Sequence, residues 1–157
     1  MKFHSFVGQL LSGVLNLGYE WIAHTDKKQL KISAKAFGDK LYVGGGSYNE
    51  YSGPARINRD GQCTLFWEGH TQKATNCFYL KDVPEHFDWI DSYYGKRIVG
   101  AVRFNNIKIG RIQLRNGDIH IGRIQNGFLY YDIGDKESKA GEYEALVFKP
   151  LRRISKN

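Results

Sequence analysis

The chain has 157 residues, of which 41% are hydrophobic and 14% aromatic, and 18 glycines stand against three prolines. This composition supports a buried core with many tight turns and excludes a disordered chain, at a length typical of one globular unit. The formal net charge of +7 would suit an anionic partner, but Lys and Arg are spread along the whole chain without an RNA-binding or helix-turn-helix signature, so a nucleic-acid site is not expected.

Residues 3–16 form the first predicted element, an amphipathic helix. Its apolar side chains recur at helical spacing, at Phe3, Phe6, Val7, Leu10, Leu11, Val14 and Leu17. The stretch is too short to span a bilayer and too polar for a secretory signal, so we expect residues 1–18 to pack on a β unit, with contact to a membrane surface as the alternative. Without a clear export signal the expected location is the cytoplasm, and release by an unconventional route is left open.

Short β-rich runs follow the helix, and the same series of runs occurs twice. The recurring blocks begin at Trp21 and Trp89, Ala34 and Ala101, Leu41 and Ile107, Pro54 and Ile121, Leu65 and Leu129, and Phe78 and Glu144. An almost constant offset across six blocks indicates a tandem repeat. We therefore predict an all-β fold in which two repeats, residues 19–84 and 85–150, form one pseudo-twofold module, followed by a basic tail over residues 151–157.

Two features of the first repeat could be mistaken for chemistry. Gly44-Gly45-Gly46 follows a strand, but no Lys-Ser/Thr pair comes after it, so we expect a flexible turn or bulge rather than a phosphate-binding loop. Cys63 and Cys77 lack metal-ligand spacing and lie in no nucleophile motif. A disulfide is sterically possible if the strands near residues 63–67 and 77–81 pair, but two buried free thiols are the expectation in a chain without an export signal.

The second repeat contains a strong hairpin signal. The seven-residue run that starts at Ile107 recurs almost unchanged at Ile119, and Asn116-Gly117 between them predicts a two-residue type I′ turn. This turn places Leu114 opposite Ile119 and Ile112 opposite Ile121. Alternation breaks at the Gly-Arg pair of each strand, which predicts a bulge there. The flat edge of this hairpin favours a homodimer.

Enzymatic and metal-binding signatures are absent from the sequence. The five histidines, His4, His24, His70, His86 and His120, have neither HExxH nor HxH spacing. Trp21, Trp67 and Trp89 each lie inside an apolar run and are expected to anchor the core. We therefore predict a non-enzymatic protein without a metal or other cofactor.

Several residues of the second repeat match a known pattern, at Trp89, Gly95, Ala101, Ile109-Gly110-Arg111, Gly122-Arg123 and Tyr143-Glu144-Ala145-Leu146-Val147. Over about residues 19–150 the chain resembles tandem DM-nine repeat proteins, with the first repeat more diverged. The resemblance implies a compact pseudo-twofold β module, and it implies the functions of that family. Its members include invertebrate lectins that recognise mannose, act in innate immunity and form dimers.

The resemblance also implies where a sugar would bind. The family relies on an Asp in the early Gly-containing segment, for which Asp39 stands here, and on the Lys of a Pro-Gly-Lys motif. That motif has become Pro54-Ala55-Arg56 in the first repeat and Ile121-Gly122-Arg123 in the second, so a cation persists but its shape changes. The segment around Asn106 in the second repeat has no carboxylate.

Sugar recognition needs converging hydrogen-bond donors and acceptors, often beside an aromatic face. We expect a first site from Asp39, Glu50 and Arg56, with Tyr48 or Tyr51 as the platform. In the second repeat the analogous residues are Asn106, Asp118 and Arg123. The first alternative is that Asp39 and Arg56 form only a surface ion pair. The other is an interaction or structural protein that contacts proteins or anionic surfaces without binding sugar.

Overall fold

The computed structural model describes residues 18–150, so the expected N-terminal helix and the basic tail lie outside the described residues. The all-β prediction is confirmed. Within residues 18–150 the one helical element is the short 3-10 helix η1 (Lys27–Ile32), capped by the side chain of Asp26. No helix in this range is long and apolar enough to cross a membrane.

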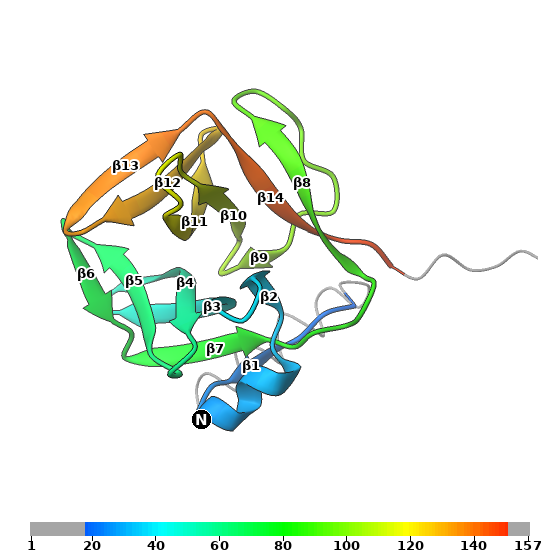
Figure 1. Ribbon diagram of the computed structural model, residues 1–157, viewed down its shortest axis with the longest axis vertical. Helices are drawn as coiled ribbons and strands as arrows, with labels where there is room; N and C mark the ends of the chain where they lie inside the picture. Colours follow the sequence, from blue (N-terminus) through cyan, green and yellow to red (C-terminus); the bar gives the residue numbers. More distant parts are fainter. Residues whose placement is uncertain (1–17, 151–157) are drawn as a thin grey trace, which may run out of the picture.

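Two antiparallel sheets of seven strands make up the fold (Figure 1). The first comprises β1 (Trp21–Ala23), β2 (Lys35–Phe37), β3 (Leu41–Tyr48), β4 (Tyr51–Asn58), β5 (Cys63–Trp67), β6 (His70–Lys73) and β7 (Asn76–Leu80). The second comprises β8 (Phe87–Tyr93), β9 (Arg103–Phe104), β10 (Ile107–Gln113), β11 (Ile119–Gln125), β12 (Phe128–Ile133), β13 (Lys136–Ala140) and β14 (Glu142–Phe148).

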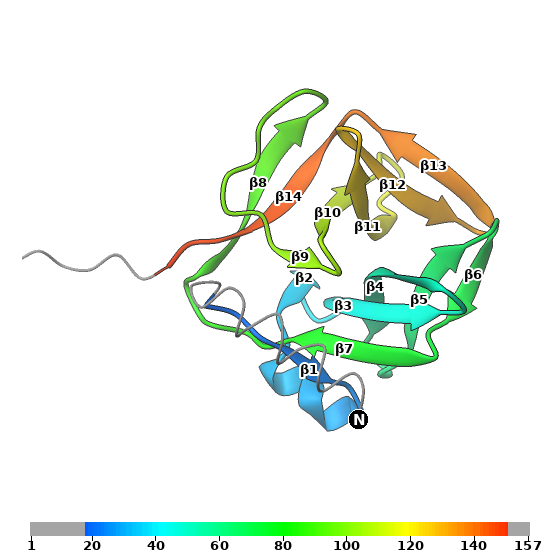
Figure 2. The same cartoon turned by 180° about the vertical axis from the view of Figure 1, so that it is seen from behind.

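The two sheets share one topology. Their strand orders are β1-β7-β3-β4-β5-β6 and β8-β14-β10-β11-β12-β13, with β2 added to β3 and β9 added to β10. Each strand of the first sheet therefore has a counterpart seven strands later, which confirms the tandem architecture. We call the two halves the first and second copy. β2 and β9 lie side by side in both views, where the copies meet (Figures 1 and 2).

The strand register corrects one block of the sequence alignment. Thr64 pairs with Arg56, and Tyr130 pairs with Arg123, so Thr64 and Tyr130 are equivalent. Leu65 therefore corresponds to Tyr131 and not to Leu129. A shift of two residues leaves every side chain on the same face of a strand, so the apolar pattern could not distinguish the two alignments.

The glycine run of the first copy is part of a strand, and the prediction of a turn or bulge was wrong. Gly44, Gly45 and Gly46 occupy the middle of β3, which pairs with both β4 and β7. A Cβ on Gly45 would overlap the ring of Phe104 from the second copy, and one on Gly46 would come within 2.9 Å of the Asn76 carbonyl. These glycines are needed for close packing across the strand.

The β10–β11 hairpin is confirmed, but its predicted register and turn were wrong. Gln113 pairs with Ile119, one position away from the predicted register, and the ladder continues to Lys108 without the expected bulge. The Gly117 amide donates to the Leu114 carbonyl at 2.9 Å, and only Gly117 of the Asn-Gly pair has a positive φ. The loop therefore has three residues, a type that also ends in glycine.

This hairpin does not provide the free edge that favoured a homodimer. β10 pairs with β11 and β14, and β11 pairs with β10 and β12, so both strands are interior. The strands of the second sheet that pair with only one other strand are β8, β9 and β13. A dimer through the hairpin edge would require the sheet to open.

The copies share a hydrophobic core and exchange tryptophan hydrogen bonds. Trp21 of the first copy donates from Nε1 to the Arg103 carbonyl at 3.0 Å, and Trp89 of the second donates to the Lys35 carbonyl at 3.3 Å. Trp21 is 4% exposed in the shared core, whereas Trp67 and Trp89 are half-buried and pack against the core clusters. The anchoring role expected of these residues is therefore strongest for Trp21.

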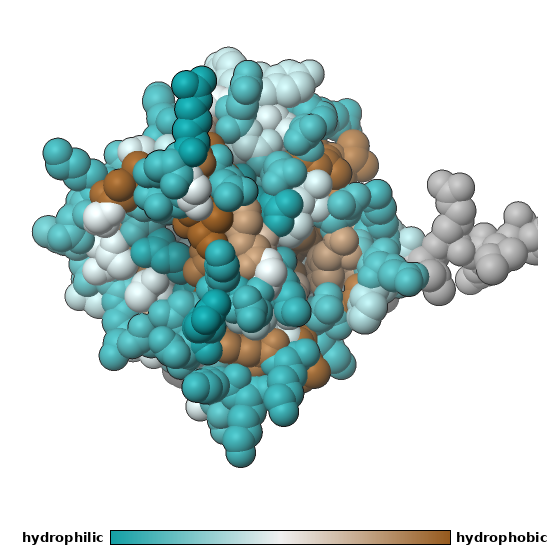
Figure 3. Space-filling model, in the orientation of Figure 1, coloured by the Kyte–Doolittle hydropathy of each residue, from teal (hydrophilic) through white to brown (hydrophobic). Residues whose placement is uncertain are grey.

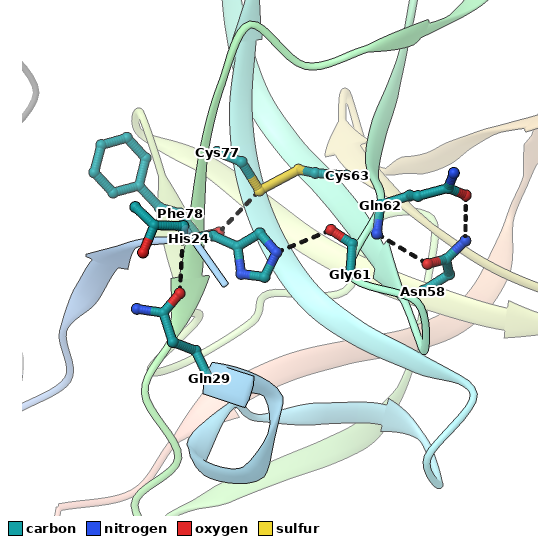
Figure 4. Close-up of a disulfide and its surroundings, with 9 residues drawn as sticks. His24, Gln29, Asn58, Gly61, Gln62, Cys63, Cys77 and Phe78 are labelled. Carbon is teal, nitrogen blue, oxygen red and sulfur yellow. Dashed lines mark hydrogen bonds between the residues drawn. A yellow bond between two sulfur atoms is a disulfide. The ribbon is translucent and has the colours of Figure 1, made fainter. Parts of the chain in front are cut away.

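Cys63 and Cys77 form a disulfide, so the expectation of free thiols was wrong (Figure 4). β5 and β7 do not pair, yet the Cα atoms of the two cysteines are 6.4 Å apart. The first sheet coils so that β5 lies over the glycine strand, where a Cβ on Gly46 would be 3.5 Å from Leu65. Sheet coiling, and not strand pairing, brings the sulfurs together.

Candidate functional site

The six predicted site residues do not gather into one site for each copy. Asp39 of the first copy and Asp118 of the second line one groove together. Arg56 and Arg123 both line a small cavity where the copies meet. Glu50 lies in the turn between β3 and β4, and Asn106 lies in the turn between β9 and β10, both exposed. The copies therefore build sites across their interface.

The groove has a volume of about 710 Å³ and runs between the β2–β3 turn and the β10–β11 hairpin. We call it the composite groove, and its lining residues are Phe37, Gly38, Asp39, Lys40, Arg111, Gln113, Gly117, Asp118, Ile119 and His120. The turn is set by Gly38, with φ of 55°, and by the Lys40 amide, which donates to the Phe37 carbonyl at 2.9 Å. Figure 3 shows apolar surface recessed between hydrophilic side chains near the middle of the face drawn in Figure 1.

The two carboxylates of the composite groove are only weakly engaged. Asp39 is 74% exposed and lies 3.7 Å from the exposed guanidinium of Arg59, a pair of little energetic weight. Asp118 accepts one hydrogen bond, from the Asn116 side-chain amide at 3.1 Å. Both carboxylates therefore keep free oxygen lone pairs at the groove surface, where they can accept hydrogen bonds from a ligand.

Arg111 forms one wall of the composite groove and ties the copies together. Its Nε donates to Glu144 at 2.7 Å, and its Nη1 donates to the Ala36 carbonyl of the first copy. The guanidinium lies over the Phe37 ring at 4.9 Å and over the Trp89 ring at 4.7 Å. A planar cation held by hydrogen bonds and two aromatic faces is a rigid wall.

A polar cluster lies at the far end of the same groove. A second hollow of about 380 Å³ shares Lys40, Ile119 and His120 with the composite groove and reaches Arg56 and Asp132. Arg56 forms a two-pronged ion pair with Asp132 of the second copy, with Nη2 2.8 Å from Oδ2. The ion pair expected between Asp39 and Arg56 is therefore not formed.

Asp132 is the residue that the sequence did not reveal. It is 4% exposed and accepts a further hydrogen bond from the Thr71 hydroxyl at 2.6 Å. Burial alone would raise the pKa of its carboxyl, but the hydrogen bonds and charge of Arg56 and the bond from Thr71 outweigh burial, so the pKa is lowered. The available signal was a lone acid inside the apolar run of β12.

Arg123 is neutralised in a different way from its counterpart Arg56. Its Nη1 lies 2.7 Å from Glu137 of its own copy, its Nε donates to Gln125 at 2.6 Å, and it lies over the Tyr130 ring. The cavity between the two arginines holds about 20 Å³, roughly the space of one water molecule. Neither arginine is therefore free to receive a sugar ring there.

His120 lies between the composite groove and the polar cluster. Its ring is half-buried 5.1 Å from the Tyr131 ring, and its enclosed Nε2 has no hydrogen-bond partner among residues 18–150. Burial lowers the pKa of His120, as does the charge of Arg56, while Asp132 and Asp118 raise it less. His120 thus favours its neutral form, in which it presents both a donor and an acceptor.

No His, Cys, Asp and Glu side chains cluster as a metal site within the described range, 18–150. No family model matches the chain, and no curated protein matches it. Among solved structures, the nematode sperm cell motility protein MFP2B is similar, at 16% sequence identity with a TM-score of 0.57 over 86% of this chain. The chain spans about half, 47%, of the length of that protein. At this identity the likeness shows the fold alone.

Proposed function

We propose that this chain is a non-enzymatic carbohydrate-binding protein and that the glycan lies in the composite groove. The observation that carries the proposal is the meeting of Asp39 and Asp118, one from each copy, in a single open groove. Protein carboxylates accept hydrogen bonds from neighbouring sugar hydroxyls, which present donors at a regular spacing. An open groove with weakly engaged acceptors suits a surface glycan better than a buried small molecule.

The remaining lining of the groove supports the same ligand class. Gln113 and Lys40 add exposed hydrogen-bond donors. Phe37 and Ile119 add apolar surface against which the C–H face of a sugar ring can pack. The groove thus offers polar groups for the ring hydroxyls and apolar groups for the ring face.

A mannose-type glycan is the first ligand to test, because the chain resembles DM-nine repeat lectins. Asp39 stands where that family has its site Asp, and it lines the proposed groove. Arg56 and Arg123 stand where the family has a sugar-binding Lys, but here both are held in ion pairs. The proposal therefore rests on Asp39 and its groove, and a role in innate immunity or as a homodimer follows only from the resemblance.

A glycan array tests this proposal directly. We expect the wild-type chain to bind mannosylated glycans, and we expect Asp39→Ala and Asp118→Ala each to lower the signal about tenfold, as for loss of hydrogen bonds to a charged group. Asp60→Ala removes an exposed acid outside the groove and serves as the control. Absence of wild-type binding to any glycan would refute the proposal.

A second function is a candidate because Arg56 and Arg123 are held in ion pairs with protein carboxylates. A protein with this architecture and no sugar site would act as an interaction or structural module, and the similar solved structure is described as a sperm cell motility protein. The net charge of +7 makes an anionic surface the partner to test. Binding to vesicles that contain phosphatidylserine, lost steeply as salt rises, together with a blank glycan array, would favour this function.

A further inference from the structure

We infer that the chain has one glycan site and not two, because Arg111 keeps the composite groove open while the equivalent groove of the other copy is closed. The inference rests on the proposed function. Arg111 is a positioning residue here, since its hydrogen bonds go to protein groups and its guanidinium holds the groove wall.

Arg111 and Gly45 occupy the same position in the two copies. Gly44 and Gly110 are equivalent, each at the centre of the strand that pairs with the closing strand of its copy, opposite Tyr79 and Ala145. The next residue along is Gly45 in β3 and Arg111 in β10. The same place in the fold thus carries either no side chain or the longest cationic one.

Around Gly45 two aromatic rings meet directly. The Phe104 ring occupies the space that a Cβ on Gly45 would need, and it contacts the Trp21 ring edge-on with centroids 5.0 Å apart. Phe104 is 0% exposed and Trp21 is 4% exposed. The aromatic pair thus fills the place next to Gly45 that is equivalent to the composite groove next to Arg111.

Around Arg111 the equivalent rings pack against the guanidinium. Phe37 and Trp89, the counterparts of Phe104 and Trp21, each lie within 5 Å of the guanidinium and are only half-buried. The guanidinium fills the place above β10 that the Phe104 ring fills above β3. Phe37 therefore lies at the surface, where it lines the composite groove.

The turns that border the positions of Arg111 and Gly45 also differ, and the difference again leaves one groove open and the other closed. Between β2 and β3 the first copy has three residues, which include Asp39 and Lys40, whereas between β9 and β10 the second has only Asn105 and Asn106. Asn105 donates from Nδ2 to the Ser52 carbonyl of β4 at 2.9 Å. This bond ties the shorter turn to the facing hairpin, so the counterpart of the composite groove is bridged and has no carboxylate on its turn.

A titration followed by amide NMR on the 157-residue chain tests the inference, with methyl α-D-mannopyranoside as the probe. We expect one set of shifted amides around Asp39, Gln113 and Asp118, and unchanged amides at the equivalent positions Ser47 and Asn106. Equal shifts in both sets would overturn the single-site inference but leave carbohydrate binding intact. No shifts anywhere, together with a blank array, would instead overturn the proposed function.

Variants at the two equivalent positions sharpen the test. Arg111→Gly recreates the Gly45 environment and should weaken probe binding about tenfold or more, while Ser47→Ala, the counterpart of the exposed Gln113, should leave it unchanged. Amide dispersion in the NMR spectrum establishes that each variant is folded. If folded Arg111→Gly binds as tightly as the wild type, Arg111 does not hold the groove open. If it does not fold, the wild-type shift map alone decides the number of sites.

Discussion

Asp132 is the one buried charged residue of the described chain, and it joins the two copies through Arg56 and Thr71. A buried carboxylate keeps its charge only if partners replace the water that it loses. At the positions related to these by the pseudo-twofold, Phe66 stands in place of Asp132 and Glu137 stands in place of Thr71. Arg123 therefore pairs with a carboxylate of its own copy. The arginine of the first copy is thus neutralised by the second copy, whereas the arginine of the second copy is neutralised within its own copy.

Removing the Asp132 carboxylate should destabilise the protein strongly. Asp132→Ala leaves Arg56 partly buried without a counter-charge, which we expect to lower the free energy of unfolding by about 3 kcal/mol. Urea unfolding followed by tryptophan fluorescence measures the change. Asp39→Ala is the matched control, because its ion pair with Arg59 is exposed, and it should cost less than about 1 kcal/mol. Equal losses in the two variants would show that the buried pair is not a stabilising junction.

Stability should fall on acidification, and His120 should account for the first part of the fall. Because the folded-state pKa of His120 lies below its ordinary value of 6.5, the unfolded chain takes up the proton more readily. Its contribution is present above about pH 6.5 and is lost as the pH falls through the folded-state pKa. Unfolding measured from pH 7 to pH 5 should therefore show a shallower slope in His120→Gln than in the wild type. The lowered pKa of Asp132 acts in the same direction at lower pH.

The strands that meet at the centre depend on glycine because other groups occupy the space above them. Gly44, Gly45 and Gly46 let β3 pass under Ile57, Phe104 and Asn76, and Gly110 and Gly122 face each other in the equivalent hairpin. The coiling that results also brings Cys63 to Cys77. In the second copy the equivalents of the cysteines are Leu129 and Tyr143, which pack in one apolar cluster.

Gly45→Ala should be destabilising although alanine favours a strand no less than glycine does. The added methyl group overlaps the buried Phe104 ring, and overpacking of this kind costs about 1–3 kcal/mol. Gly141→Ala is the control, because its methyl group would lie 3.7 Å from Phe128, an ordinary contact. Thermal unfolding by circular dichroism compares them. A Gly45→Ala protein as stable as Gly141→Ala would mean that the ring does not seal this position.

Reduction of the disulfide should loosen the first copy. The bond closes a loop with a sequence separation of 14 residues, for which chain entropy predicts a stabilisation of about 3 kcal/mol. Dithiothreitol should therefore lower the melting temperature of the wild type, while the double variant Cys63→Ala/Cys77→Ala melts at one low temperature with or without the reductant. A wild-type melting temperature that does not respond to complete reduction, verified by thiol titration, would contradict this expectation.

The sequence predicted the strands and their duplication well because both follow from local patterns. The alternation and the repeated Ile107 and Ile119 motifs are visible without tertiary information. The hairpin register was missed because Asn116-Gly117 suits both a two-residue and a three-residue loop. Asp39 and Asp118 were both selected, but their meeting depends on how one copy packs against the other, which no motif within a copy encodes.

The molecule as a whole is a duplicated sheet in which equivalent positions have diverged. The turn of the first copy faces the hairpin of the second across an open groove, while the reciprocal turn is bonded to β4 through Asn105. Duplication supplied two equivalent places at the interface. One of these two places is accessible to a ligand, because it has Arg111 where the other has Gly45 and because the turn at Asp39 is longer.

Calorimetric titration with the glycan that gives the strongest array signal tests most directly whether Asp39 and Asp118 serve one site. A shared groove predicts one glycan per chain, with Asp39→Ala and Asp118→Ala each weakening that same binding event about tenfold. Two glycans per wild-type chain, with each variant losing one of them and binding the other at unchanged affinity, would show that Asp39 and Asp118 belong to separate sites.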